Sequence, residues 1–166
     1  PKLSKYIQEK KNNKIEFIQN KSLELSLFLS LPATIALLIS SEEITSSLFG
    51  YGSFDIFSVK NSANALFYFA LGLPAFALIK VFSSFLFARH NTKTPFIFSL
   101  YSVILNITIS LYFFDKIGFI IIPIATTISS WFNSLLLFVY LTSENYFSFS
   151  KSFFSSFFKI ILATSI

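Results

Sequence analysis

The chain has 166 residues, of which 54% are hydrophobic and 13% are charged, and its formal net charge is +5. Soluble domains carry about 25% charged residues, so the composition excludes an ordinary soluble domain and indicates an integral membrane protein. The chain has no Cys and a single His, His90. This excludes disulfides, thiolate metal sites and a histidine-rich metal cluster, and we expect neither a metal nor another cofactor.

The first 22 residues are the most polar part of the chain and predict a basic connector. Charge runs of this kind are typical of a solvated loop between two spans. A helix lying on the membrane surface is the alternative, because four apolar residues have helical spacing: Leu3, Ile7, Ile15 and Ile18. An apolar run over 23–41 follows, and its length of roughly 20 residues predicts a transmembrane helix.

Three further apolar runs predict transmembrane helices over 62–88, 96–114 and 117–142, and a fifth run, 153–166, predicts the start of another. We therefore expect an all-α fold, a polytopic transmembrane helix bundle with four full spans and the start of a fifth. Prolines inside three of the spans predict kinks or local breaks: Pro32, Pro74 and Pro123. The polar segments between the spans predict loops over 42–61 and 89–95, a very short turn around Asp115 and Lys116, and a connector over 143–152.

The cationic residues predict an orientation. Nine Lys or Arg lie in the polar segments on one side of the membrane and two on the other, as expected if the richer side is cytoplasmic. The segments 1–22, 89–95 and 143–152 are then cytoplasmic, and 42–61 is periplasmic. Basic residues beside apolar runs orient helices, so nucleic acid is not an expected partner. The nine are Lys2, Lys5, Lys10, Lys11, Lys14, Lys21, Arg89, Lys93 and Lys151, and the two are Lys60 and Lys116.

Lys80 lies inside the 62–88 span, where a cation costs roughly 2.5–3.5 kcal/mol at the bilayer centre. It could face a water-filled pathway and attract an anion such as a phosphate, or it could snorkel to the headgroups. Arg89, His90 and Lys93 form a basic cluster at the cytoplasmic mouth of this span. They could bind anionic headgroups or a phosphorylated substrate, or serve only as positive anchors of the helices.

Uncharged polar residues on two spans form a second candidate site. Asn106 and Ser110 are four residues apart and so share a helix face, and Thr126, Thr127 and Asn133 lie on the next span. These side chains could line a pathway or bind a cation through oxygens; the alternative is hydrogen bonding between packed helices. The spans contain no paired carboxylates and the chain has no glycine-rich nucleotide loop, so we do not expect an enzyme.

The stretch from Lys80 to Pro95 reads KVFSSFLFARHNTKTP and resembles the signature loop of lipid II flippases of the MurJ (MviN) family. Upstream, Leu31-Pro32-Ala33 and LFGYGSF at 48–54 resemble the family's Leu-Pro helix and a periplasmic loop. Downstream, a set of residues resembles the following span: Gly118, Ala125, Thr126 and Asn133. The segments occur in the family's order and cover nearly the whole chain.

The resemblance implies part of the C-terminal half of a fourteen-helix, alternating-access transporter of the multidrug/oligosaccharidyl-lipid/polysaccharide exporter superfamily. The start at Pro1 and the absence of Met also predict a fragment, so the rest of its own chain is an expected partner. The implied substrate is lipid II, an undecaprenyl-pyrophosphate-linked peptidoglycan precursor, moved across the bacterial inner membrane.

The resemblance also implies roles for the candidate residues. Lys80 would attract the pyrophosphate, and Arg89 and Lys93 would lie at the cytoplasmic gate. Some members of the family have a cation site at the positions that match Asn106, Ser110 and Thr126 of this chain. Those members have a carboxylate where this chain has Ser110.

Two alternatives to a lipid II flippase stay open. One is another exporter of the same superfamily that moves drugs or a different polyprenyl-linked polysaccharide. The other is a non-transporting membrane scaffold whose intramembrane polar residues only pack helices. Membrane lipids are expected partners in every case.

Overall fold

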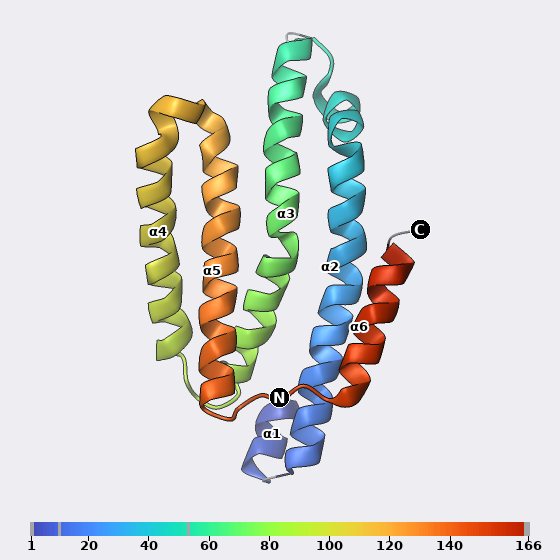
Figure 1. Ribbon diagram of the computed structural model, residues 1–166, viewed down its shortest axis with the longest axis vertical. Helices are drawn as coiled ribbons and strands as arrows, with labels where there is room; N and C mark the ends of the chain where they lie inside the picture. The colour runs from blue at the N-terminus through green and yellow to red at the C-terminus, as the bar shows by residue number, and fades with distance from the viewer. Residues whose placement is uncertain (1, 10, 53, 165–166) are drawn as a thin grey trace.

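The computed structural model describes residues 2–9, 11–52 and 54–164, and every regular element in these ranges is a helix. Figure 1 shows four long helices side by side in a layer, in the order α4, α5, α3, α2, with α6 lying along α2. The expected all-helical fold is confirmed. The elements are α1 (Lys2–Gln8), α2 (Asn12–Phe49), α3 (Ile56–Phe87), α4 (Lys93–Ile117), the 3₁₀ turn η1 (Gly118–Ile120), α5 (Ile121–Ser143) and α6 (Lys151–Thr164).

Three helical stretches of the described chain are long and apolar enough to cross a membrane: Asn12–Phe49, Ile56–Phe87 and Lys93–Ser143. The third contains α4, η1 and α5 and doubles back on itself, so α4 and α5 lie antiparallel (Figure 1). These two helices have 25 and 23 residues, and each exceeds the ~20 residues that a crossing requires. The last two residues of the expected 153–166 span lie outside the described residues.

The reversal between α4 and α5 depends on Gly118. Its φ of 71° and ψ of −154° are open to glycine, whereas a residue with a Cβ would be strained there. Pro123 follows in the first turn of α5. A missing backbone N–H costs little in the first turn of a helix. Pro123 therefore lies at the start of α5 and does not kink the helix, contrary to the prediction.

The helices extend beyond the apolar runs. α2 already begins at Asn12 and continues to Phe49, so much of the expected 1–22 connector and the first part of the expected 42–61 loop are helical. Backbone hydrogen bonding continues through these polar segments because polar side chains do not stop a helix. The break within α2 lies at Ser40, with φ −107° and ψ 19°, and not at Pro32. Pro74 lies inside α3.

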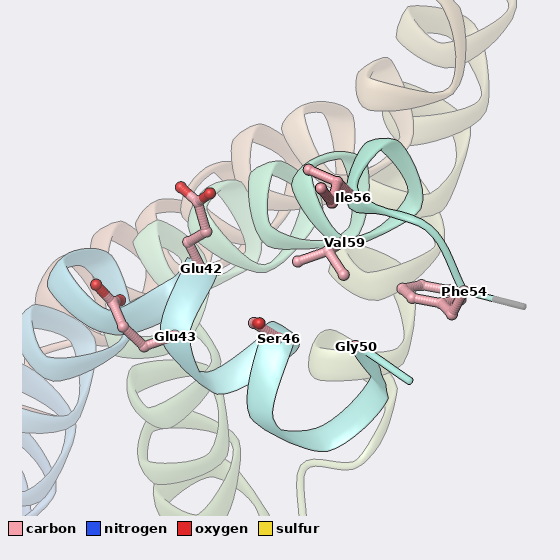
Figure 2. Close-up of a pocket in the computed structure, with 7 residues that line it drawn as sticks. All are labelled: Glu42, Glu43, Ser46, Gly50, Phe54, Ile56 and Val59. Atoms are coloured by element: carbon pink, nitrogen blue, oxygen red, sulfur yellow. The ribbon is translucent and has the colours of Figure 1, made fainter. Parts of the chain in front are cut away.

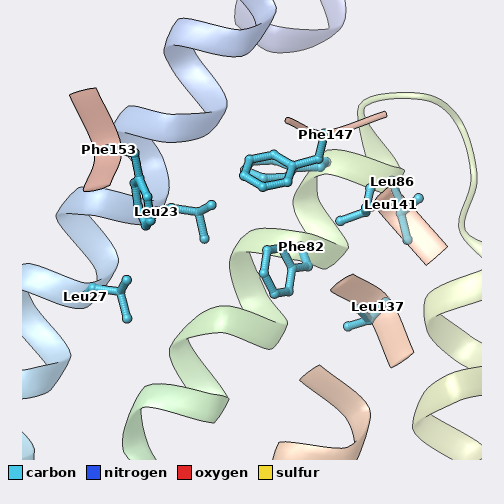
Figure 3. Packing of buried hydrophobic residues seen from close by; sticks show 9 residues of the cluster. Leu23, Leu27, Phe82, Leu86, Leu137, Leu141, Phe147 and Phe153 are labelled. Atoms are coloured by element: carbon cyan, nitrogen blue, oxygen red, sulfur yellow. The ribbon is translucent and has the colours of Figure 1, made fainter. Parts of the chain in front are cut away.

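Buried apolar side chains gather at one end of the layer, where α2 begins and α3 and α5 end (Figure 3). Phe147, in the connector between α5 and α6, stacks on Phe85 with ring centroids 6.1 Å apart. The set joins α2 and α3 to the stretch that contains the end of α5, the connector and the start of α6. We call it the Leu–Phe cluster, and it comprises Leu23, Leu27, Phe82, Phe85, Leu86, Leu137, Leu141, Phe147 and Phe153.

Candidate functional site

Lys80 is exposed on α3, on the side of the helix away from the Leu–Phe cluster. An α-helix turns by about 100° per residue, so Lys80 points about 200° away from Leu78 and from Phe82. Those two residues line an apolar groove of about 480 Å³ between α2, α3, α5 and α6. Lys80 therefore lies on the opposite face of the layer, which we call the Lys80 face.

A polar pocket of about 280 Å³ lies between α3, α4 and α5. It belongs to the Lys80 face, because Asn133 in its wall is about 200° around α5 from Trp131 in the apolar groove. Its wall on α3 is Ile79, the residue before Lys80. Small polar side chains dominate the full lining: Ile79, Ser99, Ser102, Val103, Asn106, Thr126, Ser129, Ser130 and Asn133.

Two of the three polar residues expected to share a site meet in this pocket. The Nδ2 of Asn106 donates hydrogen bonds to Thr126 Oγ1 at 3.1 Å and to Ser129 Oγ at 3.3 Å. Ser110 is not among the residues that line the pocket. Its Oγ is buried and has no hydrogen-bond partner within the described part of the chain.

The pocket fits poorly with the cation site that the family resemblance implies. Its lining is uncharged, and the described residues contain no group of three or more His, Cys, Asp or Glu that could hold a metal. Asn106 turns an N–H toward Thr126, and an N–H donor repels a cation. The arrangement is suited to hydrogen bonding between neutral groups.

Arg89 is half-buried just after the end of α3. Its Nη1 donates to Phe85 O at 3.2 Å and its Nη2 to Tyr146 O at 2.9 Å, and its guanidinium carbon lies 4.6 Å from the centre of the Tyr146 ring. Burial lowers the pKa of Arg89, yet an arginine keeps its charge in proteins. Lys93, the first residue of α4, is exposed. The two predicted gate cations therefore differ, since only Arg89 contacts the connector between α5 and α6.

Two amide residues with no role in the sequence analysis complete this contact. Gln19 Nε2 donates at 3.0 Å to the same carbonyl that Arg89 binds. Asn20 Nδ2 donates to Ser148 O at 2.9 Å, and its Oδ1 accepts from Ser150 N at 3.0 Å. Both amide side chains are buried. We call Gln19, Asn20 and Arg89 the polar clamp, because together they hold the connector to α2 and α3.

Helices α3 and α5 approach closely at Gly72. Thr127 Oγ1 donates to Tyr68 O at 2.7 Å, and Trp131 Nε1 donates to Leu71 O at 3.1 Å. A Cβ on Gly72 would lie 2.9 Å from Thr127 Oγ1. A side chain at this position would therefore displace the threonine from its interhelical bond.

Replacing Gly72 by valine is expected to destabilise the full-length protein by about 1–3 kcal/mol, the usual cost of overpacking. Thermal unfolding in detergent measures the effect. Ala36→Val is the matched control, because Ala36 is exposed on α2 and should leave the melting temperature unchanged. Equal melting temperatures for Gly72→Val and the control would contradict the close approach of α3 and α5.

A further hollow of about 370 Å³ lies at the turn between α2 and α3. Figure 2 shows the carboxylates of Glu42 and Glu43 at one side of it and Phe54 at the other. Both glutamates are exposed. Two solvated carboxylates identify no ligand, so the candidate site is the Lys80 face.

Long apolar helices with a lysine and a polar pocket on one shared face define the class: a multi-pass helical membrane protein with a polar surface inside its membrane region. Comparison with known proteins gives the family. The family model described as "Lipid II flippase MurJ" matches residues 1–166. The chain belongs to the lipid II flippase MurJ family.

Individual relatives agree with this assignment. The probable lipid II flippase MurJ of Rickettsia prowazekii (strain Madrid E) is 37% identical over 145 residues, which are 87% of this chain and 29% of the relative. That of Rhizobium meliloti (strain 1021) is 41% identical over 138 residues, 83% of this chain and 26% of the relative. A solved structure described as "Lipid II flippase MurJ, inward closed conformation" matches with a TM-score of 0.81 and 29% identity, over 98% of this chain and 33% of that chain. The chain thus spans a third or less of the length of these proteins.

Proposed function

We propose that this chain forms part of a lipid II flippase in the bacterial inner membrane, which moves the undecaprenyl-pyrophosphate-linked peptidoglycan precursor between leaflets. Family membership supports the class of transporter. The observation that carries the proposal is the position of Lys80, an exposed cation within an apolar helix and beside a polar pocket. A cation at membrane depth is costly and typically faces a polar pathway or an anion.

The role of Lys80 in this proposal is electrostatic. A pair of unit charges 4 Å apart is worth about 4 kcal/mol at an effective dielectric constant near 20, and this attraction would offset part of the desolvation cost of the pyrophosphate. Lys93 is exposed at the start of α4 and would meet the headgroup first. Arg89 lies nine residues, or about 14 Å, along the chain from Lys80. Because it binds the connector, it would shape the edge of the entrance.

Transport of this kind requires no covalent step. The site must favour the headgroup in one conformation and release it in another, because a ligand shifts an equilibrium only by its difference in affinity for the two states. We propose that the rest of the protein's own chain supplies the other wall of the pathway. The apolar groove and the outer faces of the helices would contact membrane lipids. The connector between α5 and α6 would be cytoplasmic and the turn between α2 and α3 periplasmic.

The test uses the full-length protein in proteoliposomes that contain labelled lipid II, with an impermeant reagent that modifies only headgroups in the outer leaflet. We expect modification of the inner-leaflet pool to exceed that in protein-free vesicles. Movement of a drug or another polyprenyl-linked glycan in place of lipid II would favour another exporter of the superfamily. If no cargo moves, the membrane scaffold becomes the better reading.

A further inference from the structure

The wall of the polar pocket offers hydrogen-bond acceptors. The hydroxyl of Ser102 donates to Phe98 O at 2.9 Å, and the hydroxyl of Ser130 donates to Thr126 O at 2.7 Å. A hydroxyl has one hydrogen and two lone pairs. With each hydrogen used on its own helix, the two serine oxygens can only accept bonds from whatever enters the pocket.

Asn133 adds a third acceptor without a protein partner. The residue is 6% exposed, and its Nδ2 makes one long hydrogen bond, 3.5 Å, to Ser99 Oγ. Its Oδ1 is buried and has no hydrogen-bond partner among the described residues. Buried amide oxygens are nearly always paired, with protein or with water. The pocket therefore contains an unpaired amide oxygen beside serine acceptors.

We propose that this pocket binds water within the membrane region and that the water donates a hydrogen bond to Asn133 Oδ1. The volume of about 280 Å³ has room for several molecules at about 30 Å³ each. Water fits better than a cation, because the lining has no carboxylate and both Asn106 and Asn133 present N–H groups there. The Lys80 face is then hydrated at α4 and α5. This inference does not depend on which cargo the protein moves.

The experiment measures thiol reactivity in the full-length protein in native membranes. These 166 residues contain no Cys, so Ser130→Cys places a single new thiol in this region, and the parent protein without it gives the background. The probe is a small cationic methanethiosulfonate, which reacts with thiolates. Ile104→Cys is the control, because Ile104 is 54% exposed on α4 and does not line the polar pocket.

We expect Ser130→Cys to react at least about tenfold faster than Ile104→Cys, since apolar surroundings that raise a thiol pKa by one unit remove about nine-tenths of the thiolate. Adding Asn133→Leu should slow the reaction toward the Ile104→Cys rate. Equal slow rates for Ser130→Cys and Ile104→Cys would overturn the proposal. So would a fast rate that Asn133→Leu leaves unchanged, which would place the water elsewhere.

Two additions to the experiment cover a variant that fails to accumulate and the possibility of a bound cation. If Ser130→Cys does not accumulate in membranes, Ser102→Cys on the facing wall takes its place with the same expectations. The reaction is repeated in sodium, potassium and choline chloride at equal ionic strength. Equal rates support water. Protection by sodium or potassium, but not by choline, would overturn it in favour of a bound cation.

Discussion

Lys80→Ala in the full-length protein is expected to reduce lipid II translocation by about tenfold or more, because a charge pair lost at membrane depth is worth more than the 1.4 kcal/mol that a tenfold change requires. The protein should reach the membrane at normal levels, since Lys80 is exposed and is not in the Leu–Phe cluster. The proteoliposome assay measures the rate, and immunoblotting of membranes measures the amount.

The control is Lys60→Ala, which removes another exposed lysine from the same helix near its opposite end. It should leave translocation unchanged. Lys80→Arg retains the charge and should preserve much of the activity, whereas Lys80→Met retains the stem alone and should behave like alanine. Full activity of Lys80→Ala would mean that the lysine only snorkels to the headgroups, and the proposed role on the Lys80 face would be lost.

Arg89→Ala is expected to loosen the connector between α5 and α6. The change removes two hydrogen bonds from a charged donor, one of them to Tyr146 O, and the stacking of the guanidinium on the Tyr146 ring. Bonds to charged groups contribute about 1.5–3 kcal/mol each, although half-burial of Arg89 reduces this. Amide hydrogen exchange over 145–150 should therefore accelerate by about tenfold or more.

Lys93→Ala is the control for Arg89→Ala, because Lys93 is an exposed cation only four residues away. It should leave the exchange of the connector unchanged. Arg89→Lys keeps the charge but lacks the planar fork that contacts two carbonyls, so its connector should also exchange faster than that of the parent protein. If Arg89→Ala reduces translocation without altering connector exchange, Arg89 acts on the substrate directly and the clamp assignment is wrong.

The sequence was informative wherever an element depends on local composition. The apolar runs predicted all four long helices, because each run alone is long enough to cross a bilayer. Their ends were harder to place. Asn12, Glu42 and Glu43 lie in polar stretches that read as loops, yet a helix continues into water when nothing in the sequence stops it.

The candidate site was predictable only in part. The shared face of Asn106 and Ser110 follows from spacing, and Asn106 meets Thr126, whereas Ser110 does not line the pocket. The polar clamp depends on contacts that no spacing reveals, since Gln19 bonds a carbonyl 127 residues away. Two adjacent amides just before an apolar run were the one available signal. Asn133 was one of several uncharged polar residues named on its span, and no pattern singled it out, although its unpaired oxygen is the clearest polar feature of the pocket.

The Leu–Phe cluster and the polar clamp both lie where α2 begins and α3 and α5 end. Further along the layer, α3 and α5 are also held together at Gly72 by the hydrogen bonds of Thr127 and Trp131. With 32 residues, α3 is about 48 Å long. A tilt of about 10° about the end that holds the Leu–Phe cluster would move the far end of such a helix by about 8 Å, and the bonds of Thr127 and Trp131 to α3 oppose such a tilt between α3 and α5.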